Sequence, residues 1–207
     1  MSDTHLDRVY GARTRDEARA AYDDWAERYE RDLCAMGYRL PAAFAAVFAA
    51  YVPRGAGPIL DAGCGGGIQS EPLALLGYGP LIGIDLSEGM LAVAEGKGLY
   101  AELRAMALGG RLDFPDDHFA ATFACGCISP GHAPASSFDD LIRVTRPGGL
   151  VLFSLRADAG QDPDFPGAVA RLESAGLWRE VFSTAPFQSM PYGEPEITHR
   201  VHVYEVL

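Results

Sequence analysis

The sequence predicts an α/β fold built on a mostly parallel sheet, and three observations predict it. Short apolar strands alternate with helical segments from residue 58 onward, a glycine-rich loop joins the first strand to the helix after it, and no helix separates the last two strands. Such alternation is typical of βαβ units, whose strands run parallel through right-handed crossovers. The length of 207 residues suffices for one sizeable core.

The N-terminal segment predicts helices. Tyr22, Trp25, Ala26 and Tyr29 fall at i, i+3, i+4 and i+7, which places them on one face of a helix. A second helix is expected over about residues 41–51, with proline in its first turn. We expect the first helix to be a lid that brings Tyr22, Trp25 and Tyr29 onto a bound cofactor; the alternative is an ordinary core stripe.

Seven strands are expected after this segment, at residues 59–61, 81–85, 103–106, 120–125, 150–155, 178–182 and 197–206. Between them we expect a helix ending at Gly77, a helix capped by Ser87, and helices over residues 138–145 and 167–175. Pro147-Gly148-Gly149 should stop the third of these helices. The sheet should therefore carry helices on both faces and an antiparallel last strand. We treat residues 1–207 as a single domain, with a helical cap over 1–52 and the core over 53–207.

Composition excludes several classes of partner. The net charge of −11 repels phosphate backbones, so neither nucleic acid nor an anionic membrane surface is expected. The apolar run at 44–52 is far shorter than the ~20 residues that span a bilayer. The start lacks a secretory pattern, and four cysteines do not suggest a disulfide scaffold. We expect a cytoplasmic monomer or homodimer that acts on a small molecule.

The strongest motif is the run Asp61-Ala62-Gly63-Cys64-Gly65-Gly66-Gly67, which follows one strand and opens a helix. Glycines let the chain turn sharply and let a ligand approach the backbone. The next strand ends in Asp85, where a carboxylate can accept hydrogen bonds from ribose hydroxyls. Ligands of such sheets bind outside the carboxyl ends of the strands, so we expect both elements to share one site.

Two cofactors fit that geometry. A dinucleotide calls for Gly-x-Gly-x-x-Gly, which Gly65, Gly67 and Ser70 approximate only if serine replaces the third glycine. S-adenosylmethionine instead carries an amino-acid end, which Asp61 is placed to organise. The acidic residue before the glycines therefore favours S-adenosylmethionine, with S-adenosylhomocysteine as product, and no metal is expected.

The chain also resembles the class I methyltransferases, whose sheet is Rossmann-like. The glycine run resembles their first motif, Gly83-Ile-Asp85-Leu-Ser87-Glu-Gly-Met90-Leu their ribose-binding motif, and Arg143-Val-Thr-Arg146-Pro-Gly-Gly149 the turn before their fifth strand. The resemblance extends from about residue 22 to the C-terminus. A closer likeness, to the methyltransferase-like group named for the Williams–Beuren syndrome region, rests on Tyr22-Asp-Asp-Trp25-Ala-Glu-Arg-Tyr29, Leu112-Asp-Phe-Pro115 and Gly131-His-Ala-Pro134.

This resemblance implies cofactor contacts from four loops: Asp61, Gly63, Cys64 and Gly65 at the methionine end, Asp85, Leu86 and Met90 at ribose and adenine, Met106, Ala107 and Leu108 beside adenine, and Cys125 and Gly126 beside the sulfonium. Many class I enzymes have an acidic residue where this chain has Met106, Ala107 and Leu108. We expect backbone groups to replace that acid.

These features predict a methyltransferase that works by in-line displacement on a small acceptor, where alignment and exclusion of water matter most. His132 and Tyr29 are the candidate general bases; the alternative for His132 is a loop histidine bonded to backbone. Cys125 and Cys127 are either ligands for a soft atom such as arsenic or buried small residues. Two other functions stay open: a non-catalytic binding module and a nicotinamide-dependent dehydrogenase.

Overall fold

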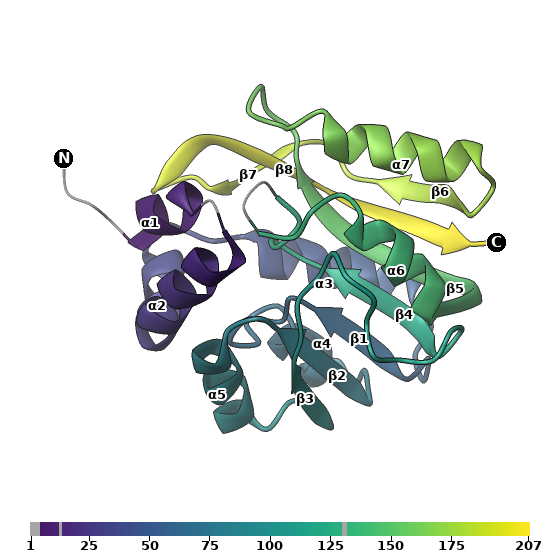
Figure 1. The fold of residues 1–207 in the computed structure, drawn as a ribbon, viewed down its shortest axis with the longest axis horizontal. Helices are drawn as coiled ribbons and strands as arrows, with labels where there is room; N and C mark the ends of the chain where they lie inside the picture. The colour runs from purple at the N-terminus through teal and green to yellow at the C-terminus, as the bar shows by residue number, and fades with distance from the viewer. Residues whose placement is uncertain (1–4, 13, 130–131) are drawn as a thin grey trace.

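The computed structural model describes residues 5–12, 14–129 and 132–207. Over these residues the chain forms an eight-stranded sheet in the order β3-β2-β1-β4-β5-β8-β6, with β7 paired to β8 (Figure 1). The strands are β1 (Ile59–Ala62), β2 (Leu81–Asp85), β3 (Glu102–Ala105), β4 (Phe119–Ala124), β5 (Thr145–Arg156), β6 (Trp178–Ser183), β7 (Phe187–Met190) and β8 (Glu194–Val206). The first five are parallel, whereas β8 is antiparallel to β5, β6 and β7. The predicted fold class is confirmed, including the antiparallel last strand.

Two features differ from the prediction. β7 is an eighth strand within a Pro/Gly-rich stretch that we expected to carry none, and it pairs with β8 by a short turn in which the Gly193 N–H donates to the Met190 carbonyl. β5 begins at Thr145 rather than at residue 150, so Pro147-Gly148-Gly149 lies inside a strand. The Thr145 hydroxyl donates to the Leu141 carbonyl at 2.7 Å and ends the preceding helix there.

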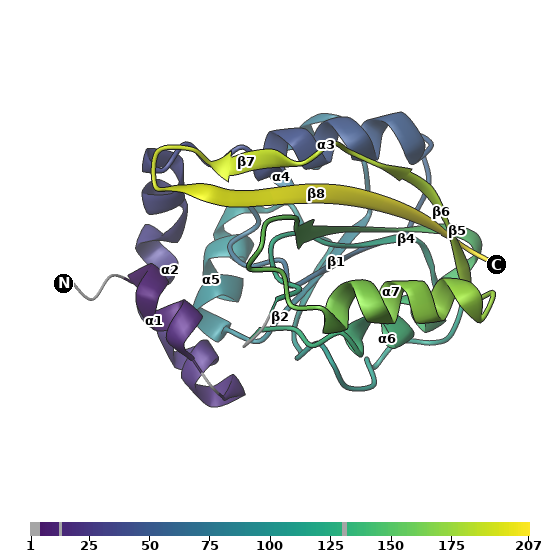
Figure 2. The same cartoon turned by 90° about the horizontal axis from the view of Figure 1, so that it is seen from above.

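Helices cover both faces of the sheet (Figure 2). They are α1 (His5–Gly11), α2 (Arg15–Ala35), α3 (Leu40–Tyr51), α4 (Glu71–Leu75), α5 (Glu88–Lys97), α6 (Ser137–Val144) and α7 (Asp164–Ser174). α3 and α4 pack Phe44, Phe48 and Leu73 into the core on one face, and α6 and α7 pack Phe138 and Leu172 into the core on the other. No single helix among the described residues is long and apolar enough to cross a membrane; α2 and α3 pass that test of length and composition only as a pair bent by 85°.

The N-terminal helices lie across one end of the sheet (Figure 2). Thr14 caps α2 by accepting from the Glu17 N–H, and α1, which we did not predict, packs against α2. Asp23 on α2 accepts hydrogen bonds from the Ser87 hydroxyl at 2.6 Å and from the Gly89 N–H at 3.0 Å. Those two donors sit at the start of α5, so α2 is docked directly above the carboxyl end of β2.

Candidate functional site

The glycine loop after β1 is tied to the neighbouring strand. The N–H groups of Gly63 and Cys64 both donate to the Ile84 carbonyl, at 2.8 and 2.9 Å. Gly63 has φ +81°, and a Cβ there would lie 2.7 Å from Cys127 Sγ. At Gly65, φ is +52° and a Cβ would meet no atom within 4 Å. Gly63 is therefore required by packing, whereas Gly65 leaves open space at the loop.

Asp85 at the end of β2 meets this loop. Its Oδ2 accepts the Gly65 N–H at 2.8 Å, and its Oδ1 accepts the Ser87 N–H at 2.9 Å. Burial raises the pKa of Asp85 above its ordinary value, although the hydrogen bonds from Ser87 and Gly65 work to lower it. A carboxylate has about four acceptor sites, and the backbone N–H groups of Ser87, Gly65 and Leu86 act on this one, so it retains capacity for a ligand hydroxyl.

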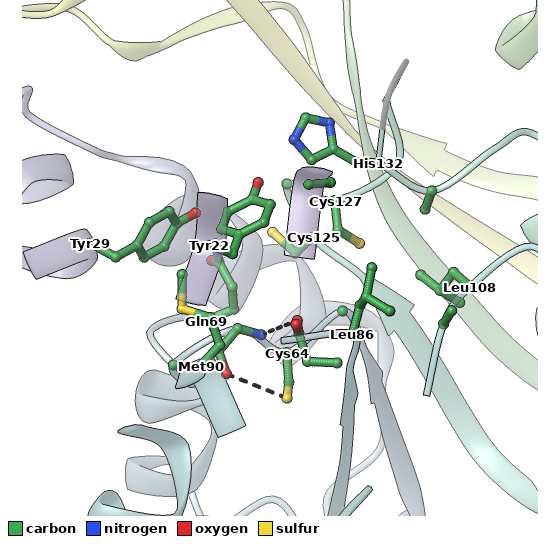
Figure 3. A pocket seen from close by; sticks show the side chains of 18 of the residues that line it. Tyr22, Tyr29, Cys64, Gln69, Leu86, Met90, Leu108, Cys125, Cys127 and His132 are labelled. Atoms are coloured by element: carbon green, nitrogen blue, oxygen red, sulfur yellow. Dashed lines mark hydrogen bonds between the residues drawn. The ribbon is translucent and has the colours of Figure 1, made fainter. Parts of the chain in front are cut away.

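A cavity of about 830 Å³, open to solvent, lies at the carboxyl ends of β1, β2 and β4 (Figure 3). The site residues expected from the sequence that line it are Tyr22, Tyr29, Gly63, Cys64, Gly65, Asp85, Leu86, Met90, Met106, Ala107, Leu108, Cys125, Gly126 and His132. Figure 3 shows Tyr22 and Tyr29 side by side on α2, with Cys125 and His132 beside Tyr22.

Trp25 does not line this cavity, contrary to our expectation. Its ring is 1% exposed, stacks on His5 at 5.7 Å between centroids, and meets Tyr29 edge-on at 4.8 Å. Its Nε1–H donates to Asp32 at 2.9 Å. The ring turns toward α1 because that helix supplies the apolar partners Leu6 and Val9.

Asp61 is also absent from the cavity wall and lies behind the glycine loop. Its side chain is fully buried, and its Oδ2 accepts hydrogen bonds from the Ser70 and Tyr100 hydroxyls, both at 2.7 Å. Burial raises its pKa to about 7 against the lowering effect of these two hydrogen bonds. The carboxyl group thus ties the loop, the start of α4 and the segment before β3 together.

Seven described residues that line the cavity were not among the expected cofactor contacts: Arg15, Ala18, Gly66, Ile68, Gln69, Cys127 and Ala133. Arg15 Nη2 donates to the Leu108 carbonyl at 3.1 Å, and the Gln69 amide donates to the Tyr38 hydroxyl at 2.8 Å. The contacts of Arg15 and Gln69 join segments that are 93 and 31 residues apart. For Cys127 a signal was present, because it lies two residues after Cys125 in the loop past β4.

His132 stands where α2 meets the loop after β4. Its Nδ1 lies 2.9 Å from Ser129 Oγ, and its ring meets Tyr22 edge-on at 5.6 Å between centroids. Tyr22 in turn meets Tyr29 edge-on at 6.0 Å. The neighbouring Pro130 and Gly131 of the sequence motif lie outside the described residues. The structure therefore places both candidate bases, His132 and Tyr29, on one wall of the cavity.

The cavity thiols are poor candidates for ligands of a soft atom. Burial raises the pKa of Cys64, Cys125 and Cys127, and the nearby Asp61 carboxylate adds to the shift at each of them. Cys127 Sγ donates to the Ala62 carbonyl at 3.1 Å. The thiols stay protonated at neutral pH, and the described residues hold no group of three His, Cys, Asp or Glu side chains arranged for a metal ion.

Comparison with known proteins adds independent evidence. A family model described as a methyltransferase domain matches residues 60–153. Methyltransferase-like protein 27 of Homo sapiens is 35% identical over 166 residues, which cover 76% of this chain and 66% of that protein. A ubiquinone biosynthesis O-methyltransferase of Pseudomonas putida is 34% identical over 100 residues, covering 46% of this chain and 43% of that one. The chain thus spans about two thirds of the first relative's length and less than half of the second's.

A solved structure shares the fold. The TehB-like SAM-dependent methyltransferase from Corynebacterium glutamicum superposes with a TM-score of 0.65 at 22% identity, over 91% of this chain and 99% of that one. At that identity the likeness concerns the arrangement of helices and strands.

Proposed function

Because the chain belongs to the class I S-adenosylmethionine-dependent methyltransferases, we propose that it transfers a methyl group from S-adenosylmethionine to a small-molecule acceptor. The observation that carries the proposal is the cavity at the carboxyl ends of the parallel strands, where the glycine loop and the Asp85 carboxylate meet. The bacterial relative, an O-methyltransferase of ubiquinone biosynthesis, supports a small acceptor.

The residues present fit the cofactor. Gly65 leaves a space that any side chain would fill, so a ligand can lie against the backbone there. Asp85 retains acceptor capacity for a ribose hydroxyl beside its bonds to the backbone. We assign the methionine end to Gly63, Cys64 and Gly65, and hold Asp61 to a supporting role behind them.

The remaining assignments follow the walls of the cavity. We assign adenine to an apolar slot with backbone groups at its edge, and the region of the sulfonium to the end of β4. The residues of the slot are Leu86, Met90, Met106, Ala107 and Leu108, and those near the sulfonium are Cys125 and Gly126. Tyr22 and Tyr29 project from α2 and close the remaining side of the cavity.

When bound, the cofactor supplies a methyl carbon activated by positive sulfur, and the carbon–sulfur electron pair leaves with S-adenosylhomocysteine. The task of the chain is to align the acceptor and to exclude water. His132 takes the proton from an acceptor that is protonated at neutral pH, with Tyr29 as the second candidate base.

We also propose that the protein is a cytoplasmic monomer or homodimer. It consists of one domain, with a cap over 1–52 and the core over 53–207. The four free thiols support the cytoplasmic location.

Calorimetric titration tests the proposal. S-adenosylhomocysteine should bind the full chain, whereas NAD and NADP should not, and a panel of small acceptors should yield a methylated product by mass spectrometry. Binding of NAD alone would replace the proposal with a dehydrogenase. Tight binding of S-adenosylhomocysteine without product from any acceptor would contradict catalysis and leave a binding module.

A further inference from the structure

A second cavity, of about 680 Å³, adjoins the first. The two share one wall, made of Tyr22, Tyr29, Gly126 and His132. Because the candidate bases lie in this wall, a molecule in the second cavity would present its reacting atom to the cofactor cavity through it. The second cavity is therefore placed to hold the acceptor.

Most of the second cavity is apolar. Its hydrophobic lining comes from segments that are far apart in the chain: α1, α2, the loop after β4, β7 and β8. The residues are Leu6, Val9, Trp25, Leu33, Ile128, Met190 and Ile197, and α3 adds Leu40. Such a lining favours a flat hydrocarbon body, since burial of apolar surface is the main source of affinity for small ligands.

One charged side chain, Arg156 at the end of β5, interrupts the apolar lining contributed by the described residues. Its Nη2 and Nε bond to Asp158 at 2.6 and 3.2 Å, while Nη1 has no protein partner within the described chain. Asp158 does not line the cavity, and it also accepts the backbone N–H groups of Gly160 and Thr198. Arg156 therefore brings a positive charge with a spare donor to the lining of this cavity, and no described carboxylate lines it. Arg156 also lines a neighbouring cavity with Leu155 and Gln161.

The neighbour of Arg156 on β8 adds no opposing charge. His199 pairs with Arg156 across the two strands, and its Nδ1 lies 2.9 Å from Ser189 Oγ. Burial and the nearby guanidinium lower the pKa of His199 to about 4, so its ring is neutral at physiological pH. A ligand that reaches this end of the cavity finds one cation and neutral hydrogen-bonding groups.

Strand geometry sets the distance between the two ends of the cavity. The Gly126 N–H donates to Ser154 Oγ at 2.8 Å, so Ser154 marks the level of the shared wall. Arg156 lies two residues farther along the same face of β5, which corresponds to about 7 Å. This is the spacing of the backbone positions, and one benzene ring with substituents at opposite ends has a comparable length.

We propose that the second cavity selects an aromatic acceptor with a carboxylate at one end, held by Arg156, and a methyl-accepting hydroxyl at the other end, beside His132. This inference rests on the proposed function. The hydroxyl proton passes to the His132 imidazole and an oxygen lone pair forms the bond to the methyl carbon. The carbon–sulfur pair stays on sulfur, so the products are an aryl methyl ether, S-adenosylhomocysteine and a protonated imidazole.

Three phenols with the same nucleophile test the proposal: 4-hydroxyphenylacetate, 4-methylphenol and 4-(2-aminoethyl)phenol. Each is titrated calorimetrically into the full chain saturated with S-adenosylhomocysteine. The anion should bind at least about tenfold more tightly than the neutral phenol, as expected for a charge-assisted hydrogen bond, and the amine should bind most weakly. Equal affinities, a preference for the amine, or no binding of any of the three would overturn the proposal.

Substitutions test whether Arg156 causes the preference for the anionic phenol. Arg156→Gln should remove the preference for the anion. The control is Arg179→Gln, which removes an exposed arginine of the edge strand β6 that pairs with Glu205; this variant should keep the preference. Asp158→Asn retains Arg156 and removes its competing carboxylate, so it should tighten binding of the anion. A preference unchanged in both Arg156→Gln and Asp158→Asn would contradict the assignment. Because S-adenosylhomocysteine is titrated first, its failure to bind would contradict the proposed function separately.

Discussion

The glycine loop after β1 and the N-terminal helices form opposite walls of one cavity, but their construction differs. The loop residues bond to Ile84 and Asp85, about twenty positions away, through backbone groups and one carboxylate. The helices contact the rest of the chain through side chains. For example, the Ser87 hydroxyl donates a hydrogen bond to Asp23, which is 64 residues away in the sequence. The first wall is specified by a short motif, whereas the second depends on tertiary packing.

The largest effect is expected from a substitution of His132, in the wall shared by the two cavities. His132→Ala should reduce the rate of methyl transfer about 10²–10⁴-fold, the usual contribution of a general base, with affinity for S-adenosylhomocysteine retained. The rate is measured over a range of pH with an acceptor identified from the panel. His118→Ala, which alters a histidine outside both cavities, is the matched control. Full turnover of His132→Ala across pH would exclude the catalytic role.

The helical wall depends on packing around Trp25. Trp25→Ala should lower the free energy of unfolding by about 3 kcal/mol, the lower end for a buried tryptophan, because it empties the contact with α1. Trp25→Phe should cost less, since most of the apolar contact survives. Both are measured by urea denaturation. Folded Trp25→Phe should bind S-adenosylhomocysteine with unchanged affinity. A large loss of affinity would indicate that the Trp25 ring contacts the cofactor.

Movement of the helical wall is the next point to test. A lid predicts fast hydrogen exchange over residues 10–35 in the free chain and slower exchange with S-adenosylhomocysteine present. At a hundredfold excess over Kd, ligand contacts raise the free energy of local opening by about 2.7 kcal/mol. α7 lies away from the cavity and serves as the internal control. Equal protection of 10–35 in both states would mean that α2 is permanently docked.

In the wall formed by the glycine loop, substitution of Asp85 should weaken cofactor binding. Asp85→Ala should weaken binding of S-adenosylhomocysteine by about 1.5–3 kcal/mol, the range for hydrogen bonds to a charged group. Asp113→Ala, at a carboxylate outside the cavity, is the control. Calorimetry that gives unchanged affinity in a folded Asp85→Ala variant would remove this residue from the ribose site.

The pH dependence of stability concerns Asp61 behind the loop. Its folded pKa of about 7 lies above its unfolded value, so between about pH 4 and 7 the folded chain keeps a proton that the unfolded chain has lost. The free energy of unfolding should therefore fall as pH rises through this window, by at most about 1.4 kcal/mol per pH unit. Asp61→Asn, which can still accept from Ser70 and Tyr100, should show a smaller fall in thermal-melting experiments. Parallel curves would contradict the raised pKa.

The contrast between the walls explains what could be predicted from the sequence. The glycine loop, Asp85 and the Ser87 cap rest on contacts within one βαβ unit, and the structure places each of them as expected. The position of Trp25 was wrong because its ring packs on a helix that carries no strong sequence signal. The second cavity was missed because it forms only when segments from both ends of the chain come together. β7 was missed although it pairs locally with β8, because it lies in a stretch whose prolines and glycines do not favour a strand.

The most direct test of the central claim, that the glycine loop and Asp85 hold the cofactor against a wall of Tyr22, Tyr29 and His132, is a crystal structure of the full chain with S-adenosylhomocysteine. We predict ribose hydroxyls within hydrogen-bond distance of Asp85 and the sulfur facing the shared wall. Density for the ligand outside this cavity, or a ribose turned away from Asp85, would contradict it.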